Sequence, residues 1–284
     1  MNIIQKIHVL GNQYLEGHKL IRLSIVAAIS FIYSNVSHAN SAWGSPLNSN
    51  EYQQLILVVT DDWQADNGYM YTFNKQEVKA EDKQDSIWVK RAPDISKTPV
   101  TIGKKGLAWG IGLHPKQKGI YKAEGDGKAP AGIFSLGNAF GYLENILTGL
   151  TYQPMTKNDF CIDVKGSPYY NQLVNSSIVG DDGVKGSTEA MRRDIHYKGD
   201  QRYRKGIFVK HNESNVNAAG SCIFMHVWKN EGIPTSGCTA MTEQNMDSIL
   251  AWLQADKKPL YVALPMAQYQ LLKTKWKLPD LAGY

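Results

Sequence analysis

Residues 220–238 read GSCIFMHVWKNEGIPTSGC, and their pattern predicts the local fold from which the rest can be worked out. The run Cys222–Val227 is apolar and contains β-branched and aromatic side chains, which is typical of a buried strand. A loop with two glycines and a proline follows and ends at Cys238. Shortly after it, Thr242 is placed to cap a helix. We therefore predict a strand, a turn-rich loop and a helix.

Similar apolar runs recur along the chain and predict a fold that is mainly β with a few helices (α+β). They are rich in β-branched and aromatic residues and are separated by turn signals. The predicted strands contain Leu55–Val59, Met70–Phe73, Ile87–Lys90, Ile133–Leu136, Gly206–Lys210 and Leu260–Leu264. Helical spacing of Met246, Ile249, Leu250 and Leu253 predicts one helix packed on the core, and a terminal helix is expected within 268–275. Residues 138–205 lack a clear period, which predicts long loops with short elements.

The first 39 residues have the features of a cleaved signal peptide. Lys19 and Arg22 form a basic flank, residues 23–36 are largely apolar, and Ala39 ends a segment of small residues suited to cleavage. A helix needs about 20 apolar residues to span a bilayer, and this run is shorter. We predict export to the periplasm with no stable membrane span after cleavage; an uncleaved anchor or a buried helix is the alternative.

The remaining chain divides into three predicted parts. Residues 40–54 are polar and turn-rich and predict a linker, 55–265 a single folded domain, and 266–284 a C-terminal extension. Hydrophobic residues make up 43% and charged residues 20%, which is ordinary globular composition. The formal net charge is +5, but Lys and Arg are scattered rather than clustered. Nucleic acid is therefore not an expected partner. The oligomeric state is not readable.

The chain contains three cysteines, Cys161, Cys222 and Cys238. Exported proteins tend to pair their cysteines, so an odd number leaves at least one thiol unpaired within the chain. The sequence around Cys238 gives this thiol a chemical role. A cysteine before a helix start has its thiol pKa lowered by the helix dipole, and the upstream His226 is a candidate base. The backbone at Gly237 is a candidate anion hole. A buried structural cysteine and a core histidine are the alternative.

These residues resemble the signature of the L,D-transpeptidase catalytic domain (YkuD-like) family. Thr235-Ser236-Gly237-Cys238 with an upstream histidine matches the family motif, and the 220–238 stretch is similar to the subgroup with a short His-to-Cys loop. Residues 125–134 are similar to the family's Thr-Pro-x-Gly-x-Phe stretch. The resemblance covers roughly residues 55–265. The chain departs from the family at Ser236 and Ala240, where His and Arg are common.

The resemblance implies a single β-sandwich-like domain and an acyltransferase that acts on peptidoglycan. Cys238 would attack a peptide carbonyl of a stem tetrapeptide, with His226 as general base, and form a thioester acyl-enzyme. An amine or water would then accept the acyl group. The expected partners are peptidoglycan stem peptides, and neither a metal nor an organic cofactor is expected. His114, His196 and His211 also lack the spacing of a metal site.

Several further residues are candidates for substrate binding. The resemblance favours Arg192 as a clamp for a substrate carboxylate, over the alternative of a solvated basic face. Thr235 and Ser236 flank the nucleophile, and Thr235 or a backbone carbonyl is a candidate to orient His226. Tyr170, Asn171 and Asp163 lie in the irregular middle of the chain, where we favour a role in loop structure for each.

Two questions stay open at this point. A hydrolase on the same scaffold, such as an L,D-carboxypeptidase or an amidase, would share the acyl-enzyme, and a non-catalytic wall-binding module is a further alternative. Cys161 and Cys222 are hypothesised to form a disulfide, with two buried free thiols as the alternative. Residues 125–128 (GDGK) superficially resemble a phosphate loop but lack its full spacing, so we interpret them as a structural turn.

Overall fold

The computed structural model describes residues 43–80, 83–91 and 97–282, and the predicted signal peptide (1–39) lies outside them. Over these ranges the fold is mainly β with four α-helices, which confirms the predicted class. The strands are β1 Gln54–Thr60, β2 Asn67–Ala80, β3 Lys83–Lys90, β4 Thr98–Thr101, β5 Leu107–Trp109, β6 Ala129–Gly141, β7 Tyr152–Pro154, β8 Asp159–Cys161, β9 Leu173–Asn175, β10 Glu189–Ala190, β11 Lys205–Val209, β12 Phe224–Val227, β13 Thr239–Met241 and β14 Leu260–Pro265. The helices are α1 Ser176–Val184, α2 Arg193–His196, α3 Glu243–Trp252 and α4 Met266–Trp276, with 3₁₀ turns at Pro46–Asn48, Arg202–Arg204 and Ala255–Lys257.

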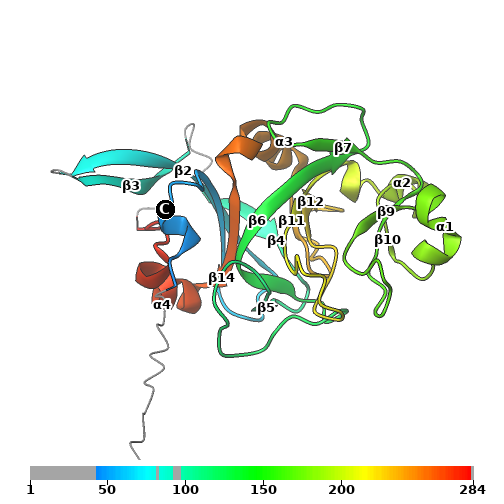
Figure 1. The fold of residues 1–284 in the computed structure, drawn as a ribbon, viewed down its shortest axis with the longest axis horizontal. Helices are drawn as coiled ribbons and strands as arrows, with labels where there is room; N and C mark the ends of the chain where they lie inside the picture. Colours follow the sequence, from blue (N-terminus) through cyan, green and yellow to red (C-terminus); the bar gives the residue numbers. More distant parts are fainter. Residues whose placement is uncertain (1–42, 81–82, 92–96, 283–284) are drawn as a thin grey trace, which may run out of the picture. The chain divides into compact units, whose positions relative to one another are not determined.

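The main sheet closes on itself to form an eight-stranded barrel. Its strands follow the order β1-β14-β6-β11-β12-β13-β4-β2, and β2 pairs with β1 to complete the ring. The pairs β1–β14 and β12–β13 are parallel, and the remaining pairs of the ring are antiparallel. Strands β5 and β7 add to β6, while β2 and β3 extend from the barrel as a hairpin (Figure 1). Because the sheet closes into a barrel, the predicted sandwich-like arrangement is not confirmed.

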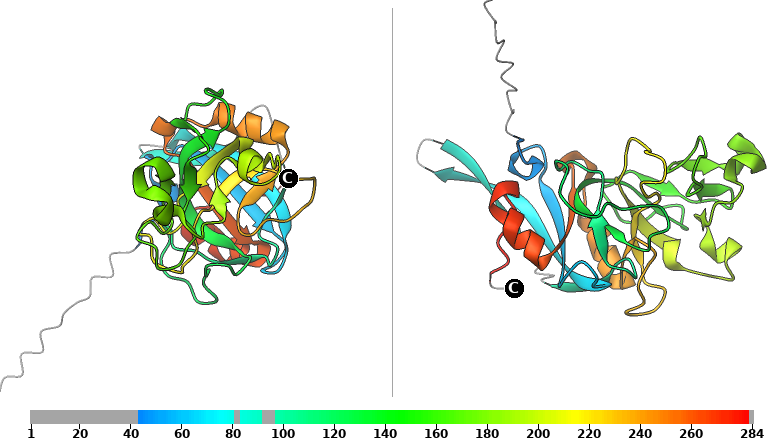
Figure 2. Two further views of the ribbon diagram at one scale, coloured as in Figure 1. Left: turned by 90° about the vertical axis from the view of Figure 1, so that its right-hand side faces the viewer. Right: turned by 90° about the horizontal axis from the view of Figure 1, so that it is seen from below.

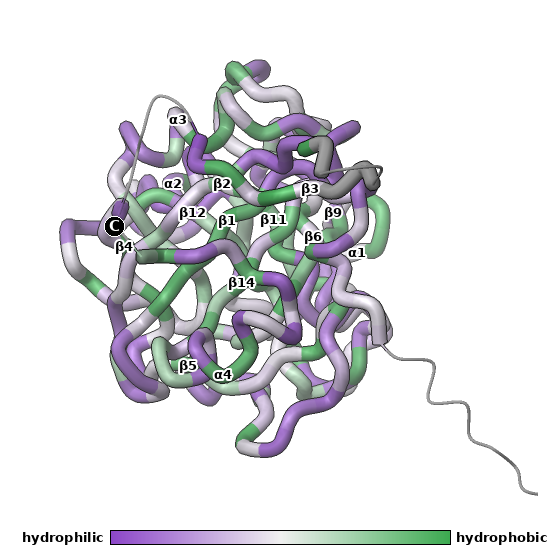
Figure 3. The backbone as a smooth tube through the Cα atoms, turned by 90° about the vertical axis from the view of Figure 1, so that its left-hand side faces the viewer, coloured by the Kyte–Doolittle hydropathy of each residue, from purple (hydrophilic) through white to green (hydrophobic). Residues whose placement is uncertain are grey.

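The barrel interior forms the larger of two hydrophobic cores. Strands β1 and β14 are buried along their whole lengths, since α4 packs against them from outside (Figure 1). In Figure 3 the hydrophobic segments run through the strands, whereas hydrophilic segments lie mostly in the connections. Burial of these continuous apolar runs is the main driving force for the barrel, at roughly 25 cal/mol per Å² of apolar surface.

A second core lies on the outer face of the barrel. Along β12, Met225 and Val227 belong to the barrel core, whereas Phe224 belongs to this outer core. The alternation follows from the two-residue period of a strand, and it directs every second side chain of β12 outward. The outer core consists of Phe140, Met155, Cys161, Met191, Tyr203, Cys222, Phe224 and Cys238.

Much of the outer core is supplied by the segment that lacks a clear sequence period. This segment forms a small sheet in the order β10-β8-β9, together with α1 and α2, at one end of the body (Figures 1 and 2). Its elements are short, as predicted from residues 138–205. The segment therefore covers the outer face of the strands that carry the candidate dyad.

The two predicted flanking parts pack on the barrel. Within the described part of the predicted linker, Ser45 Oγ donates a hydrogen bond to the carbonyl of Trp276 (2.5 Å), and Leu47 is only 1% exposed. The predicted C-terminal extension begins with α4, which confirms the terminal helix and buries Tyr269 and Trp276. Neither part is a free tail over the residues described. None of the helices in the described ranges is long and apolar enough to cross a membrane.

The packing of α4 makes a testable contribution to stability. Trp276 is fully buried and its ring lies 6.1 Å from that of Trp43 and 6.2 Å from that of Trp109. Trp276→Ala leaves a cavity, and we expect the free energy of unfolding to fall by about 3–5 kcal/mol in urea denaturation. Leu271→Ala on the same helix is the control, because Leu271 is 72% exposed and a loss of about 0.5 kcal/mol or less is expected. Equal losses in the two variants would contradict the packing of α4.

Candidate active site

Parallel pairing of β12 with β13 places Cys238 and His226. The register pairs Met225 with Thr239 and His226 with Ala240. Met225 points into the barrel, so the neighbouring positions on the two strands point outward. Cys238 immediately precedes β13 and lies two residues before Ala240, the partner of His226. Because side chains alternate along a strand, His226 and Cys238 therefore lie on the same outer face. Backbone pairing thus places the predicted nucleophile and base on the same face of neighbouring strands.

Cys238 precedes a strand rather than a helix. The three residues of β13 follow it directly, and α3 begins only at Glu243. Thr242 caps α3, since its side chain accepts a hydrogen bond from the Asn245 N–H (3.2 Å), as predicted. A three-residue strand extends about 10 Å, so the thiol is remote from the helix N-terminus. The expectation that the helix dipole lowers the thiol pKa is therefore wrong.

The thiol of Cys238 is buried and protonated in this state. Cys238 is 8% exposed; the Phe224 N–H donates to its Sγ at 3.3 Å, and its S–H points to the Cys222 carbonyl at 3.6 Å. Burial raises the pKa of Cys238 to about 12, and the negative charge of Glu189 acts in the same direction. Ionisation of this thiol therefore depends on a group that takes its proton.

His226 has the protonation state of a base. It is 2% exposed, and burial lowers its pKa to about 4, so the imidazole is neutral near pH 7. Its Nδ1 lies 2.8 Å from the Val227 carbonyl, which can only accept, so Nδ1 carries the hydrogen and Nε2 keeps its lone pair. The Tyr203 ring packs against it with centroids 5.3 Å apart. Of the two predicted orienting groups, the backbone carbonyl holds the ring and Thr235 does not.

Thr235 instead fixes the loop that carries the nucleophile. Its hydroxyl donates to the Cys238 carbonyl (2.6 Å) and accepts from the Gly237 N–H (3.0 Å). Gly237 is required here because a Cβ would come within 2.9 Å of the Lys128 carbonyl oxygen. Since the Gly237 N–H is already engaged, an anion hole built on it would have to compete with Thr235.

A pocket of about 220 Å³ opens next to Cys238. The GDGK turn forms part of its wall, where Asp126 accepts hydrogen bonds from the backbone N–H groups of Ala123 and Lys128 and pairs with Lys122 Nζ at 2.9 Å. This supports the interpretation of GDGK as a turn. The pocket is lined by Lys104, Lys122, Glu124, Gly125, Gly127, Asp163, Thr188, Glu189, Ser221, Cys222, Ile223, Ser236, Gly237 and Cys238. Charged groups of both signs therefore face the thiol.

Glu189 is the residue of this pocket that the sequence did not reveal. Its carboxylate accepts a hydrogen bond from the Tyr203 hydroxyl (2.6 Å), and Arg193 lies 3.6 Å away. Burial raises the pKa of Glu189 to about 7, although these two neighbours act against the shift. The chain has 26 acidic residues, and nothing in the local pattern distinguishes this one. Its partners Arg193 and Tyr203 lie 4 and 14 residues further along the chain, and this spacing matches no motif that we recognised.

The predicted carboxylate clamp lies outside the pocket lining. Arg192 makes a two-pronged ion pair with Asp194, with distances of 2.8 and 2.7 Å, and its guanidinium stacks over the Tyr142 ring. Nε and Nη2 are thus engaged by Asp194, and one face of the guanidinium is covered by Tyr142. The substrate role predicted for Arg192 therefore gains no geometric support, whereas the adjacent Arg193 reaches Glu189 in the pocket wall.

Tyr170 and Asn171 hold the turn that precedes β12. The Tyr170 hydroxyl donates to Glu124 (2.5 Å) and accepts from the Gly220 N–H (3.0 Å). The Asn171 side chain accepts from the Cys222 N–H (3.0 Å). These bonds fit the role in loop structure that we favoured for both residues.

Asp163 and Ser236 do line the pocket. Asp163 is bonded to both the backbone N–H and the hydroxyl of Thr188, at 2.9 and 2.5 Å. Ser236 is exposed and faces the space beside the thiol. Of the predicted substrate-binding residues, Ser236 is therefore the one whose position leaves it open to a ligand.

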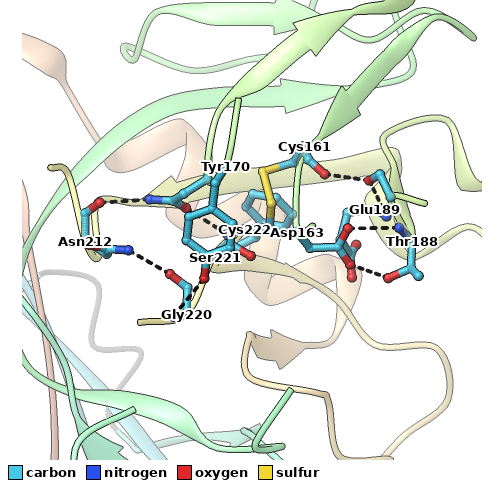
Figure 4. The surroundings of a disulfide bond; sticks show 12 residues. Cys161, Asp163, Tyr170, Thr188, Glu189, Asn212, Gly220, Ser221 and Cys222 are labelled. Atoms are coloured by element: carbon cyan, nitrogen blue, oxygen red, sulfur yellow. Dashed lines mark hydrogen bonds between the residues drawn. A yellow bond between two sulfur atoms is a disulfide. The ribbon is translucent and has the colours of Figure 1, made fainter. Parts of the chain in front are cut away.

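Cys161 and Cys222 form a disulfide, which confirms the hypothesised pairing. The bond ties β8 in the small sheet to the strand entry that leads to His226. Figure 4 shows it between Tyr170 and Ser221 on one side and Asp163, Thr188 and Glu189 on the other. The disulfide therefore fixes the pocket wall relative to the barrel. Cys238 remains a free thiol.

Comparison with protein-family models, curated proteins and solved structures finds no match to this chain.

The disulfide makes a direct prediction for thiol counting. In the unfolded, unreduced protein we expect a thiol reagent to add once, at Cys238, and after reduction three times in the chain without its first 39 residues. Mass spectrometry of the intact protein reads the count. Three additions without reduction would mean that Cys161 and Cys222 are unpaired. Replacing both by Ala should lower the free energy of unfolding by roughly 2–4 kcal/mol, because the bond closes a long loop.

The protonation state of Cys238 predicts its reactivity. A thiol with a pKa of about 12 is ionised only in small part at neutral pH, so alkylation of the folded protein should keep accelerating from pH 7 to pH 10. The urea-unfolded protein is the control, since its thiol should level off above the ordinary pKa of about 8.5. Cys238→Ala should take up no label in the folded state. A plateau below pH 9 in the folded protein would show that the site holds a thiolate.

Proposed function

We propose that the chain is an exported acyltransferase of the L,D-transpeptidase type that acts on peptidoglycan stem peptides. Cys238 serves as the nucleophile and His226 as its general base. On this proposal the barrel and its outer site correspond to the family's catalytic domain, and the periplasm is the place of action. The observation that carries the proposal is a neutral His226, fixed by the Val227 carbonyl, on the same outer face as a free thiol that borders a pocket.

The acylation step follows from these protonation states. Sγ of Cys238 attacks a stem-peptide carbonyl while Nε2 of His226 takes the thiol proton, so the S–C bond forms as the S–H bond breaks. His226 then passes this proton to the departing amine as the C–N bond breaks. Cys238 is left as a thioester, and His226 is neutral again. A preformed thiolate is not needed, which is consistent with the raised pKa of the thiol.

Positive charge near the loop supports the same step. A Cβ added at Gly237 would lie 3.5 Å from Lys122 Nζ, so this ammonium group is next to the backbone of the nucleophile. Lys122 is buried and paired with Asp126, which holds it in place. An ammonium group so placed would stabilise the oxyanion that forms on the attacked carbonyl.

Two alternatives remain, and they differ in the product. A hydrolase of the L,D-carboxypeptidase or amidase type would pass the acyl group to water, and a wall-binding module would form no thioester. The free Cys238 and the neutral His226 argue against the binding module, because neither is needed to hold a stem peptide.

The decisive experiment incubates the protein with muropeptides that carry tetrapeptide stems. Mass spectrometry should detect a thioester on Cys238 in the wild type and none in Cys238→Ala. His226→Ala should slow thioester formation by roughly 10²–10⁴-fold, the usual contribution of a general base. His196→Ala is the matched control, because His196 is exposed and bonded to the Lys157 carbonyl, and it should leave the rate unchanged. A Cys238→Ala protein that processes muropeptides at the wild-type rate would refute the proposal.

A further inference from the structure

Carboxylate side chains are part of the lining of the pocket that Cys238 borders. Glu189 and Asp163 both line the pocket that Cys238 borders, and the charge of Glu189 acts on the thiol. The Asp163 carboxylate is bonded through both oxygens to Thr188. Glu189 differs, because its contacts with Tyr203 and Arg193 both involve one oxygen. The Tyr203 hydroxyl and the Arg193 guanidinium both approach Oε2, so among the described residues Oε1 is left for a ligand.

The positive charge near Glu189 does not neutralise it fully. Arg193 lies 3.6 Å from the Glu189 carboxylate but 3.0 Å from that of Asp200, so it is shared and closer to Asp200. Asp200 also receives Arg202 at 2.5 Å. The Glu189 side chain is 23% exposed, which leaves it open to the pocket. A partly compensated carboxylate beside a nucleophile is suited to a cationic ligand.

We propose that Glu189 binds the amine that accepts the acyl group and takes a proton from it, so that this site transfers to an amine in preference to water. Tyr203 and Arg193 are the positioning residues that hold the carboxylate. The inference rests on the proposed function, because it needs the thioester on Cys238. It names the acceptor class for the second step: a primary alkyl ammonium group.

The second step balances as follows. Glu189 removes one proton from the ammonium group, and the neutral amine attacks the thioester carbonyl to form a C–N bond. His226 takes the second proton from the attached nitrogen and delivers it to Sγ as the C–S bond breaks. The products are an amide, the free Cys238 thiol, a neutral His226 and a protonated Glu189, which releases its proton to solvent. Water as acceptor has no ammonium proton to lose and does not need Glu189.

The groups around Glu189 set the pH range of this step. Burial raises its pKa to about 7; Tyr203, Arg193 and Arg202 act to lower it, while Asp163 acts to raise it. Glu189 is ionised above this pH and neutral below it. The rate of amine transfer should therefore fall as the pH drops through about 7. The rate of thioester hydrolysis should not show this fall, because water does not need Glu189.

The test measures how the thioester divides between two products. Wild type and Glu189→Gln are loaded with a tetrapeptide muropeptide in the presence of methylamine, and the ratio of amide to free acid is read by mass spectrometry. Because the charge of Glu189 raises the thiol pKa, we expect Glu189→Gln to form the thioester at least as fast as the wild type, and to lower the ratio of amide to free acid by roughly 10²-fold. Glu189→Asp keeps a carboxylate and should therefore have a higher ratio of amide to free acid than Glu189→Gln. Glu213→Gln, the same change at an exposed site paired with Lys210, should match the wild type.

A second amine separates catalysis from a purely structural role. Aminoacetonitrile is uncharged at pH 7 and has no ammonium proton to lose, so the wild type and Glu189→Gln should transfer to it at nearly equal rates. Tyr203→Phe removes a hydrogen bond that favours the ionised carboxylate, so the pH limb of methylamine transfer should move to higher pH. If Glu189→Gln only damaged the structure, transfer to both amines would fall. If Tyr203→Phe only damaged the structure, the pH at which methylamine transfer declines would not move.

The outcomes are distinguishable from failure of the proposed function. If the wild type forms no thioester on Cys238, the proposed function itself is refuted. If the wild type forms the thioester but yields only free acid with methylamine, or if Glu189→Gln keeps the wild-type ratio, the role of Glu189 is refuted and the acyl-enzyme stands.

Discussion

The parallel pairing of β12 with β13 is the constraint on which the candidate site depends. Parallel strands in register direct paired residues to the same face, so one register fixes the relation between His226 and Cys238. A shift by one residue on either strand would turn one of the two side chains into the barrel core, where Met225 and Met241 now lie. The register in turn is locked by Thr235, which joins the loop to the Cys238 carbonyl. Backbone hydrogen bonding, rather than side-chain attraction, therefore assembles the dyad.

Burial then decides what kind of chemistry this dyad supports. Desolvation disfavours charge on both partners: it raises the pKa of Cys238 and lowers that of His226, so both are neutral at rest. An ion pair between thiolate and imidazolium would have to overcome both shifts. A neutral pair that transfers its proton only as the carbonyl is attacked has no such cost at rest. On the proposed mechanism, charge would develop next to Lys122, which Asp126 holds in place.

The sequence predicts the features that depend on neighbouring residues, and it does not predict those that depend on residues far apart in the chain. Local period and capping determine three elements that the sequence predicted correctly. These are the strand at Leu55–Val59, the helix capped by Thr242 and the strand that contains His226. The closure of the sheet was not predicted, since β1 pairs not only with β2, the next strand in sequence, but also with β14, near the other end of the chain. The helix itself was predicted correctly, but the expected position of Cys238 at its start was wrong, because β13, a strand of only three residues and too short a pattern to detect, lies between them. Glu189 was missed because the pocket that it lines is assembled from residues far apart in the sequence, from Lys104 to Cys238.

The disulfide explains why a segment without sequence period can still form a precise pocket wall. Between Asn138 and Lys205 the elements are short, and most bury few apolar residues of their own. Ordering such a segment costs conformational entropy that its packing alone offsets poorly. The Cys161–Cys222 bond joins the small sheet to the barrel two residues before β12, so the wall that carries Glu189 is fixed next to the strand that carries the dyad. The position of the pocket wall that carries Glu189 therefore depends on oxidation of this pair, whereas the register of Cys238 and His226 is set within the barrel itself.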